Sequence, residues 1–308
     1  MGSVVITGGA GFIGHNLGLF LKERGHTVTL VDTLERASPL ALERLRRAGL
    51  PVIRADVRNR AAVADVARGA DLVVHAAAYV SVEESVEKPE LYMENNVLGA
   101  LSVARACLES GVPLLYFSSA SVYGEPQRLP IDESHSTKPL SPYGLSKLFG
   151  EQILELYRGQ GLKYTIFRLF NVYGPGQTSS YAGVVTRFIE RALAGEKLTI
   201  YGDGTQTRDF VHVTDVARAV ELVLEKGASG EVFNIASGKP TTINELALLV
   251  RKLACPDCGV EYQPPRPGDI KHSYADISKA RKTLGFEPKI GLEDGLRDLI
   301  LLARAKQW

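Results

Sequence analysis

The chain has 308 residues, of which 45% are hydrophobic and 23% are charged, and its 36 Lys and Arg against 35 Asp and Glu leave a net charge of +1. This is an average globular composition, which excludes disordered, collagenous and disulfide-scaffold proteins. Because basic and acidic residues are nearly equal in number, the protein lacks the net positive charge that would attract a phosphate backbone, and we expect no nucleic-acid partner. Because no apolar run reaches the roughly 20 residues of a membrane helix and Met1 to Gly14 does not resemble a signal peptide, we expect a cytoplasmic protein without membrane contact.

In the first half of the chain, short β-branched runs alternate with longer amphipathic segments, a pattern typical of repeated βαβ units and a parallel sheet. The predicted strands are Ser3 to Thr7, Thr27 to Val31, Val52 to Ala55, Leu72 to His75, Leu114 to Ser118 and Thr165 to Leu169. The predicted helices are Phe12 to Arg24, Leu40 to Ala48, Arg60 to Ala67, Pro89 to Ser110 and Tyr143 to Gln160. Strands that are apolar on both faces indicate a sheet covered by helices on both sides.

After Asn171 the chain turns to loops rich in Gly and Pro. One strand-like run, Glu231 to Ile235, is expected to return to the first sheet. The helices predicted here are Val184 to Ala194, Asp215 to Glu225, Ile243 to Leu253 and Leu292 to Ala303. We therefore predict an α/β fold, a doubly wound parallel sheet carrying a smaller irregular α/β domain, with the ligand in the cleft between them at the carboxyl ends of the strands.

A glycine-rich turn, Gly8-Gly9-Ala10-Gly11-Phe12-Ile13-Gly14, joins the first strand to the first helix. Glycines there permit close approach to a pyrophosphate, although their spacing of three and three differs from the two and three of the general Rossmann fingerprint. Asp32 ends the second strand eighteen residues after Gly14 (32 − 14), where an acid binds ribose hydroxyls and repels a 2′-phosphate. Asp32 therefore favours NAD over its 2′-phosphorylated form. We interpret Arg36 as a solvated loop charge.

Tyr143 and Lys147 lie four residues apart at the start of a predicted helix, hence on one face. A serine-rich strand end that contains Ser119 precedes them. An ordinary phenol titrates near ~10, so acid–base work at neutral pH needs a fall of roughly three units, or about 4 kcal/mol. An ammonium ~4 Å away at an effective dielectric of ~20 supplies about that much before desolvation opposes it. Lys147 together with the positive nicotinamide is therefore sufficient in magnitude, and the pair is a candidate acid–base site.

With these motifs the chain resembles the short-chain dehydrogenase/reductase superfamily and its extended, sugar-nucleotide branch, whose glycine spacing is three and three. It looks most like the UDP-glucose (UDP-galactose) 4-epimerases and their relatives that act on N-acetylated sugars. The resemblance covers nearly the whole chain. The motifs that carry it, besides the glycine turn and Tyr143 to Lys147, are Ala55-Asp56-Val57, His75-Ala76-Ala77-Ala78, Asn95-Asn96-Val97-Leu98-Gly99, Arg168 to Pro175, Arg208 to Val213 and Arg266-Pro267-Gly268-Asp269.

The resemblance implies a role for each matching residue. Tyr143 is the acid/base, Lys147 holds the nicotinamide ribose and lowers the tyrosine pKa, and Ser119 shares the hydrogen bond to the sugar hydroxyl. The other residues that would contact bound NAD are Gly8, Gly11, Phe12, Ile13, Gly14, Asp32, Asp56, Val57, Ala76, Ala77, Ala78 and Asn96. Those that would hold the UDP moiety are Asn171, Arg208, Arg266 and Asp269, and Ser273 would bound the 2-substituent of the sugar.

The implied reaction is NAD-dependent 4-epimerisation of a UDP-hexose. Tyr143 takes the proton of the 4-hydroxyl as hydride leaves C4, and the 4-keto sugar turns before hydride returns to its other face. Because Ser273 is small, N-acetylhexosamines are expected to fit as well. Residues 1–170, with 210–237, are assigned to the NAD-binding Rossmann domain, and residues 171–209 and 238–308 to the UDP-sugar-binding domain.

Several alternatives stay open. A UDP-uronate epimerase or decarboxylase of the same branch is the nearest rival, whereas Ala120 and Ser121 stand where the 4,6-dehydratases of the branch carry an Asp-Glu pair. A non-catalytic dinucleotide sensor is the second rival. Cys255 and Cys258 offer two thiolates where structural zinc needs four ligands, so we expect no metal and interpret them as an incidental or loop-closing pair. In the resembled family, the helices matching Pro89 to Ser110 and Tyr143 to Gln160 form a dimer interface, so we expect a homodimer.

Overall fold

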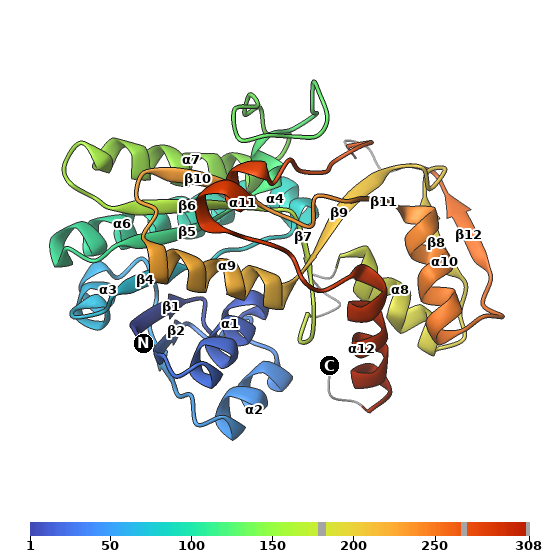
Figure 1. Cartoon of the computed structure of the whole chain (residues 1–308), viewed down its shortest axis with the longest axis horizontal. Coiled ribbons are helices and arrows are strands. Elements are labelled where there is room, and N and C mark those ends of the chain that lie inside the picture. The colour runs from blue at the N-terminus through green and yellow to red at the C-terminus, as the bar shows by residue number, and fades with distance from the viewer. Residues whose placement is uncertain (178–182, 266–269, 306–308) are drawn as a thin grey trace.

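The structure is a computed structural model, and it describes residues 1–177, 183–265 and 270–305. Seven strands form the central sheet in the order β10-β6-β5-β4-β1-β2-β3 (Figure 1), and every neighbouring pair is parallel. This order diverges from β1 in both directions, as in a doubly wound sheet. The predicted fold class is therefore confirmed. The strands are β1 Ser3–Thr7, β2 Thr27–Asp32, β3 Val52–Arg54, β4 Leu72–His75, β5 Leu114–Ser119, β6 Tyr164–Leu169 and β10 Glu231–Ile235.

Helices cover both faces of this sheet because its strands are apolar on both sides. In β1, Val4 and Ile6 belong to one core cluster together with Leu17 of the first helix, whereas Val5 belongs to the other cluster together with Val103. The helices of the first face are α1 Phe12–Glu23, α2 Pro39–Arg47, α9 Val213–Lys226 and α11 Ser278–Leu284. Those of the second face are α3 Arg60–Ala67, α6 Leu98–Ser110 and α7 Pro142–Arg158.

A smaller α/β part lies beyond the carboxyl end of β6, at the right of Figure 1. Its strands form a three-stranded sheet, in the order β11-β9-β7, and a separate pair, β12 with β8. The strands are β7 Asn171–Tyr173, β8 Leu198–Tyr201, β9 Thr207–His212, β11 Pro240–Thr242 and β12 Val260–Gln263. The helices α8 Val184–Leu193, α10 Ile243–Ala254 and α12 Leu292–Arg304 share a third core cluster with these strands.

The structure refines the predicted helices in three places. The predicted helix from Pro89 to Ser110 does begin at Pro89, but it is built of α5 Pro89–Tyr92, a π-helical turn Met93–Val97 and α6. Before it lies α4 Val82–Glu87, capped by the Ser81 side chain, which the sequence analysis did not predict. Six residues are too few to show a helical period. A 3₁₀ turn, Ala120–Val122, follows β5.

The run Glu231 to Ile235, expected to return to the first sheet, pairs in parallel with β6. The five strands of the smaller part were not predicted, because they are three to six residues long and lie among Gly and Pro. Within the described ranges, no helix is both long enough and apolar enough to cross a membrane.

Candidate active site

The glycine turn between β1 and α1 brings the backbone close to the loop that follows β4. Gly8 has φ +70°, and a Cβ there would meet the Ala77 nitrogen at 2.6 Å, while a Cβ on Gly14 would meet the Gly8 oxygen at 2.0 Å. Gly11 stands at the N-cap of α1 and offers no side chain to cap it. The first N–H groups of a twelve-residue helix are therefore available to an anion. These residues fit the pyrophosphate of a dinucleotide.

Asp32 lies at the carboxyl end of β2, beside this turn. Its Oδ2 accepts a hydrogen bond from the Ala10 N–H at 3.0 Å, and its Oδ1 accepts one from the Leu34 N–H at 2.8 Å. The carboxylate is thereby fixed next to the glycine backbone, as a ribose-binding acid requires. Its contact with the ribose stays a prediction.

The interpretation of Arg36 as a solvated loop charge is wrong. Its guanidinium donates to both carboxylate oxygens of Glu84, at 2.8 and 3.0 Å, and lies 3.6 Å from the centre of the Tyr79 ring. The Arg36 side chain is only 28% exposed. Glu84 comes from α4, 48 residues further along the chain, so no local pattern around Arg36 indicated this partner.

A cavity of about 270 Å³ lies at the carboxyl ends of the central strands, where ligand was expected. The glycine turn forms one wall, and the ends of β4 and β5 with the start of α7 form another. Its lining includes Gly8, Ala10, Gly11, Phe12, Ile13, Gly14, Arg36, Ala76, Ala78, Tyr79, Phe117, Ser118, Ser119, Tyr143 and Lys147. A larger hollow, about 1030 Å³, lies at the amino ends of the strands near Gly2, Leu72 and Tyr164. The smaller cavity is the candidate active site, because the predicted acid–base residues Tyr143 and Lys147 line it.

The predicted acid–base residues converge on this cavity. Ser141 caps α7 by accepting from the Gly144 N–H at 3.1 Å, so the helix begins with Tyr143 in its first turn. Tyr143 and Lys147 are 9% and 4% exposed, and the side chains of Ser119 and Tyr143 are hydrogen bonded. The Lys147 ammonium donates to the Phe117 carbonyl at 2.8 Å. The three candidate catalytic side chains are therefore brought together at the end of β5.

The electrostatics of this group differ from the expectation. Burial raises the pKa of Tyr143, and the hydrogen bond from Ser119 only partly opposes this. Burial also lowers the pKa of Lys147 to about 7, against the attraction of Glu151. In the chain without its cofactor, burial therefore outweighs the expected lowering of the Tyr143 pKa, an expectation that counted the positive charge of the nicotinamide together with that of Lys147. The physical reason is desolvation, which penalises both the phenolate and the ammonium in a buried site.

Three of the predicted cofactor residues bond to the protein itself or lie in its core. Asn96, buried in the π-helical turn, accepts from the Tyr79 N–H and donates to the Tyr79 carbonyl and the Ser146 hydroxyl, at 2.9 to 3.0 Å. It thereby holds the loop after β4 against α7. The Asp56 carboxylate pairs with Arg58 at 2.6 Å, and Val57 is buried. Their contact with the cofactor stays a prediction.

The predicted UDP-binding residues lie in or beside the three-stranded sheet. Asn171 begins β7 and is exposed. Arg208 on β9 donates to the Thr207 carbonyl at 2.8 Å, and the Ser273 N–H donates to the same carbonyl at 3.1 Å. The structure thus brings Arg208 and Ser273 together. None of these three is among the residues found to line the 270 Å³ cavity in the described part of the chain.

Arg266 and Asp269 lie outside the described residues, so their placement stays a prediction. Sequence reasoning also missed residues that border the site. Tyr79 and Phe170 line the cavity, and Glu151 contacts Ser118 beside it. Only Glu151 had a readable signal, since it continues the four-residue spacing of Tyr143 and Lys147 on the same helix face.

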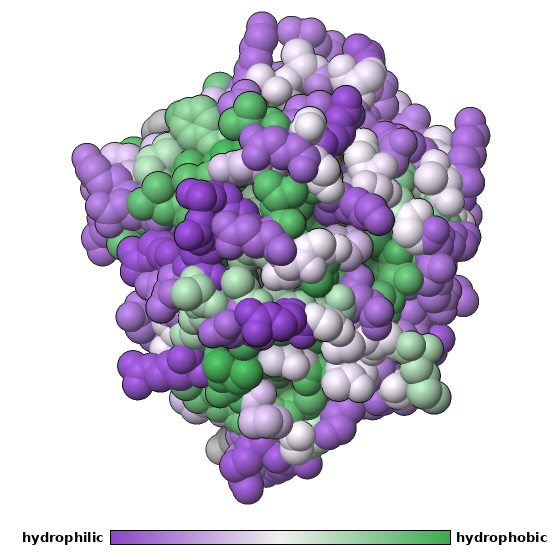
Figure 2. All heavy atoms as spheres, turned by 90° about the vertical axis from the view of Figure 1, so that its left-hand side faces the viewer, coloured by the Kyte–Doolittle hydropathy of each residue, from purple (hydrophilic) through white to green (hydrophobic). Residues whose placement is uncertain are grey.

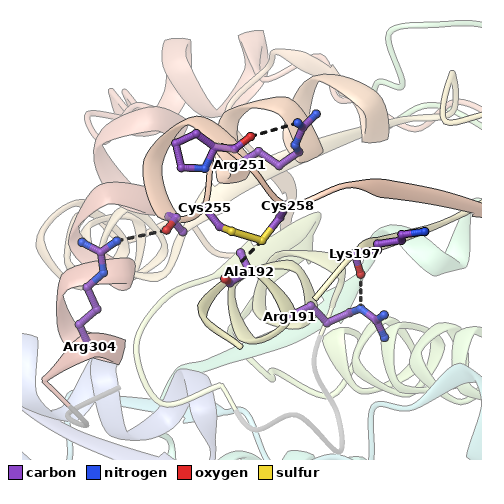
Figure 3. The surroundings of a disulfide bond; sticks show 9 residues. Arg191, Ala192, Lys197, Arg251, Cys255, Cys258 and Arg304 are labelled. Atoms are coloured by element: carbon purple, nitrogen blue, oxygen red, sulfur yellow. Dashed lines mark hydrogen bonds between the residues drawn. A yellow bond between two sulfur atoms is a disulfide. The ribbon is translucent and has the colours of Figure 1, made fainter. Parts of the chain in front are cut away.

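Cys255 and Cys258, three residues apart in sequence, close a loop. Cys255 and Cys258 form a disulfide between the end of α10 and β12, and the Cys258 sulfur lies 3.7 Å from the Ala192 carbonyl oxygen (Figure 3). The paired sulfurs are not available as zinc thiolates. Across the described ranges, no group of three or more His, Cys, Asp or Glu side chains could hold a metal ion.

The chain is similar to known sugar-nucleotide enzymes. The structure of the UDP-glucose 4-epimerase of Thermotoga maritima with UDP-glucose is 38% identical, with a TM-score of 0.93 over 99% of this chain and 100% of that one. A UDP-N-acetylglucosamine 4-epimerase from Methanobrevibacter ruminantium M1, in complex with UDP-N-acetylmuramic acid, is 36% identical, with a TM-score of 0.93 over 99% of each chain. A UDP-N-acetyl-alpha-D-glucosaminuronate decarboxylase of Bacillus cytotoxicus is 32% identical over 96% of each chain.

A family model agrees with these relatives and with the site. The model of the NAD dependent epimerase/dehydratase family matches residues 4–236, more than half of the chain. That range contains the glycine turn, Asp32 and the group formed by Ser119, Tyr143 and Lys147. The cofactor of this family is NAD. The uncapped N-terminus of α1 and the fixed Asp32 carboxylate suit that cofactor. The chain therefore belongs to the NAD-dependent epimerase/dehydratase family.

Proposed function

We propose that this chain interconverts UDP-glucose and UDP-galactose, and the corresponding N-acetylhexosamines, by inversion at C4. The observation that carries the proposal is the cavity in which Tyr143, Lys147 and Ser119 face the glycine turn across one space. A proton acceptor and a dinucleotide site would thereby lie within reach of the same sugar carbon. NAD supplies the hydride chemistry when bound.

The protein's own residues supply proton transfer and orientation. The Tyr143 hydroxyl would exchange a proton with the sugar 4-oxygen, and the Ser119 hydroxyl, bonded to Tyr143, would hold that oxygen in line. Lys147, anchored on the Phe117 carbonyl, would stabilise the phenolate by its charge. Burial of both side chains excludes water from the transfer.

We further propose that residues 1–170 with 210–237 bind the dinucleotide, and that residues 171–209 and 238–308 bind the UDP-sugar. Arg208 would contribute charge for the diphosphate, and Asn171 is exposed at the start of β7. Ser273 would border the 2-substituent of the sugar, and its side chain is small. Support comes from Arg208 and Ser273 lying together around the Thr207 carbonyl.

The test is a panel of kcat/KM values for UDP-glucose, UDP-galactose and their two N-acetyl counterparts, with the native protein and with Ser273→Tyr. We expect turnover of all four, and a selective loss for the acetylated pair in the variant, because a bulky ring would occupy the space of the acetamido group. Inactivity of the native protein on acetylated sugars, or equal loss for both classes, would refute the assignment of Ser273.

A uronate-specific enzyme is the second candidate, favoured by the 32% identical decarboxylase of Bacillus cytotoxicus. UDP-glucuronate is therefore added to the panel, with products separated by chromatography. Release of carbon dioxide would indicate decarboxylation, and a C4-inverted uronate would indicate a uronate epimerase. A sensor without activity would bleach no bound-cofactor absorbance with any of these sugars.

We also propose a homodimer, formed through α6 and α7. Apolar side chains follow the outer face of α7, where Phe149 and Leu156 are 37% and 69% exposed, and Leu98 begins α6 at 49%. The side of the molecule shown in Figure 2 carries apolar patches among hydrophilic side chains. Light scattering should give a dimer mass that Leu156→Glu lowers to that of a monomer. Leu301→Glu, at a position of α12 that is 58% exposed, is the control that should leave the dimer intact.

A further inference from the structure

The end of β5 is bonded to one face of α7 at three successive residues. The Phe117 carbonyl accepts from Lys147, the Ser118 hydroxyl donates to Glu151 at 2.5 Å, and Ser119 is bonded to Tyr143. Because the α7 residues are four apart, they stack along one face of the helix. Glu151 is therefore the third member of a row whose first two members are the proposed acid–base and its lysine.

Glu151 is itself fixed by a buried ion pair. Arg168 of β6 donates to its two oxygens, from Nε at 3.0 Å and from Nη2 at 2.7 Å, and both side chains are less than 10% exposed. Arg168 is held in turn by the Glu133 carbonyl at 3.2 Å and by the Tyr123 ring, 4.8 Å away. A carboxylate buried this deeply needs such a counter-charge.

Lys147 has few other partners. On its own helix it faces Tyr143 and Glu151, from β5 it faces the Tyr116 ring at 5.1 Å, and from β4 the buried His75. Burial raises the pKa of Tyr116 and lowers that of His75 to about 3, so both are neutral at physiological pH. Among these neighbours, Glu151 is the charged group, and its attraction opposes the fall of the Lys147 pKa.

We propose that Glu151, held by Ser118 and Arg168, is a positioning residue that keeps Lys147 charged and aligned beside Tyr143. It acts through Lys147 and does not touch the substrate. This proposal rests on the role proposed above for Lys147. Without the Glu151 carboxylate, less of the ammonium persists at neutral pH, and the phenolate of Tyr143 loses its stabilising charge.

The test compares Glu151→Gln with Arg168→Gln, because the two variants break the same ion pair but leave opposite charges. The purified protein with its bound cofactor is assayed for kcat across pH, and Lys147 is titrated by NMR of 13C-labelled lysine, assigned with Lys147→Met. In Glu151→Gln, the Lys147 midpoint and the alkaline limb of kcat should fall by roughly one to two pH units. In Arg168→Gln they should stay in place or rise.

Glu155→Gln is the matched control, since Glu155 lies one turn further along α7 and is exposed, and it should shift neither readout. If Glu151→Gln does not fold, the double variant with Arg168→Gln removes both charges and should still lower the Lys147 midpoint. An unchanged midpoint in the variants that lack Glu151, or equal shifts in both single variants, would overturn the proposal. If no UDP-sugar is turned over, the proposed function fails, but the NMR titration still decides the role of Glu151.

Discussion

Replacing Tyr143 with Phe removes one oxygen from the proposed active site and little else. The ring is buried and meets Tyr92 edge-on, with ring centres 6.4 Å apart, and Phe retains this packing. Ser119 keeps its hydrogen bond with Ser121 at 3.0 Å. The loss of one hydrogen bond costs roughly 0.5–1.5 kcal/mol of unfolding free energy. The loss of general acid–base catalysis lowers kcat by about 10²- to 10⁴-fold, or about 3–5 kcal/mol in the barrier.

Three measurements separate these effects. Initial rates of UDP-galactose conversion give kcat, urea unfolding gives the free energy of unfolding, and absorbance after denaturation gives the bound cofactor. We expect kcat to collapse, stability to fall slightly and NAD to remain bound. Tyr164→Phe is the control, because Tyr164 is also buried but its hydroxyl donates to Glu155 near the far end of α7, away from the cavity. It should lose stability and keep kcat within a few-fold of the native value.

The result that would refute this reasoning is near-normal turnover by the Tyr143→Phe protein. The acid–base role would then belong to another group, and the convergence of Tyr143 with Lys147 and Ser119 would be structural. A parallel fall of kcat in both Tyr variants would also contradict it, because a shared loss of stability would then explain the activity.

Other predictions follow from single features of the site and its surroundings. Cofactor released from denatured protein should be NAD(H) on chromatography, because the Asp32 carboxylate repels a 2′-phosphate, and recovery of the phosphorylated form would overturn that role. Burial lowers the pKa of His15 to about 4 and of His75 to about 3, below the ordinary 6.5, so unfolding takes up protons as pH falls. In urea unfolding, the free energy of unfolding should thus have its full value above pH ~6.5 and be lower by about 2 kcal/mol for each histidine at pH 5. His75→Asn should remove the part of this pH dependence that His75 causes. Replacing Cys255 and Cys258 with Ser should lower the free energy of unfolding by about 2 kcal/mol, since the loop is short, with kcat unchanged; a larger loss of kcat would tie the disulfide to the active site.

The first half of the fold was predictable because its signals are local. A run such as Leu72 to His75 is apolar on both faces, and a glycine turn that follows a strand and opens a helix indicates the ligand edge of the sheet. Spacing alone put Tyr143 and Lys147 on one helix face. The sequence by itself therefore determined the central sheet, the nucleotide edge and the pair at the start of α7.

Only the tertiary structure decided which distant side chains meet and how charge behaves there. The sequence around Arg36 suggests a solvent-exposed charge, but the packing of α4 supplies Glu84 as its partner. The charges of Lys147 and the nicotinamide suggested a lowered tyrosine pKa, but in the chain without its cofactor burial raises the pKa of Tyr143 and lowers that of Lys147. Both results depend on contacts between segments that are remote in sequence, and on the exclusion of water from a packed interior. A local residue pattern predicts neither the contacts between remote segments nor the exclusion of water.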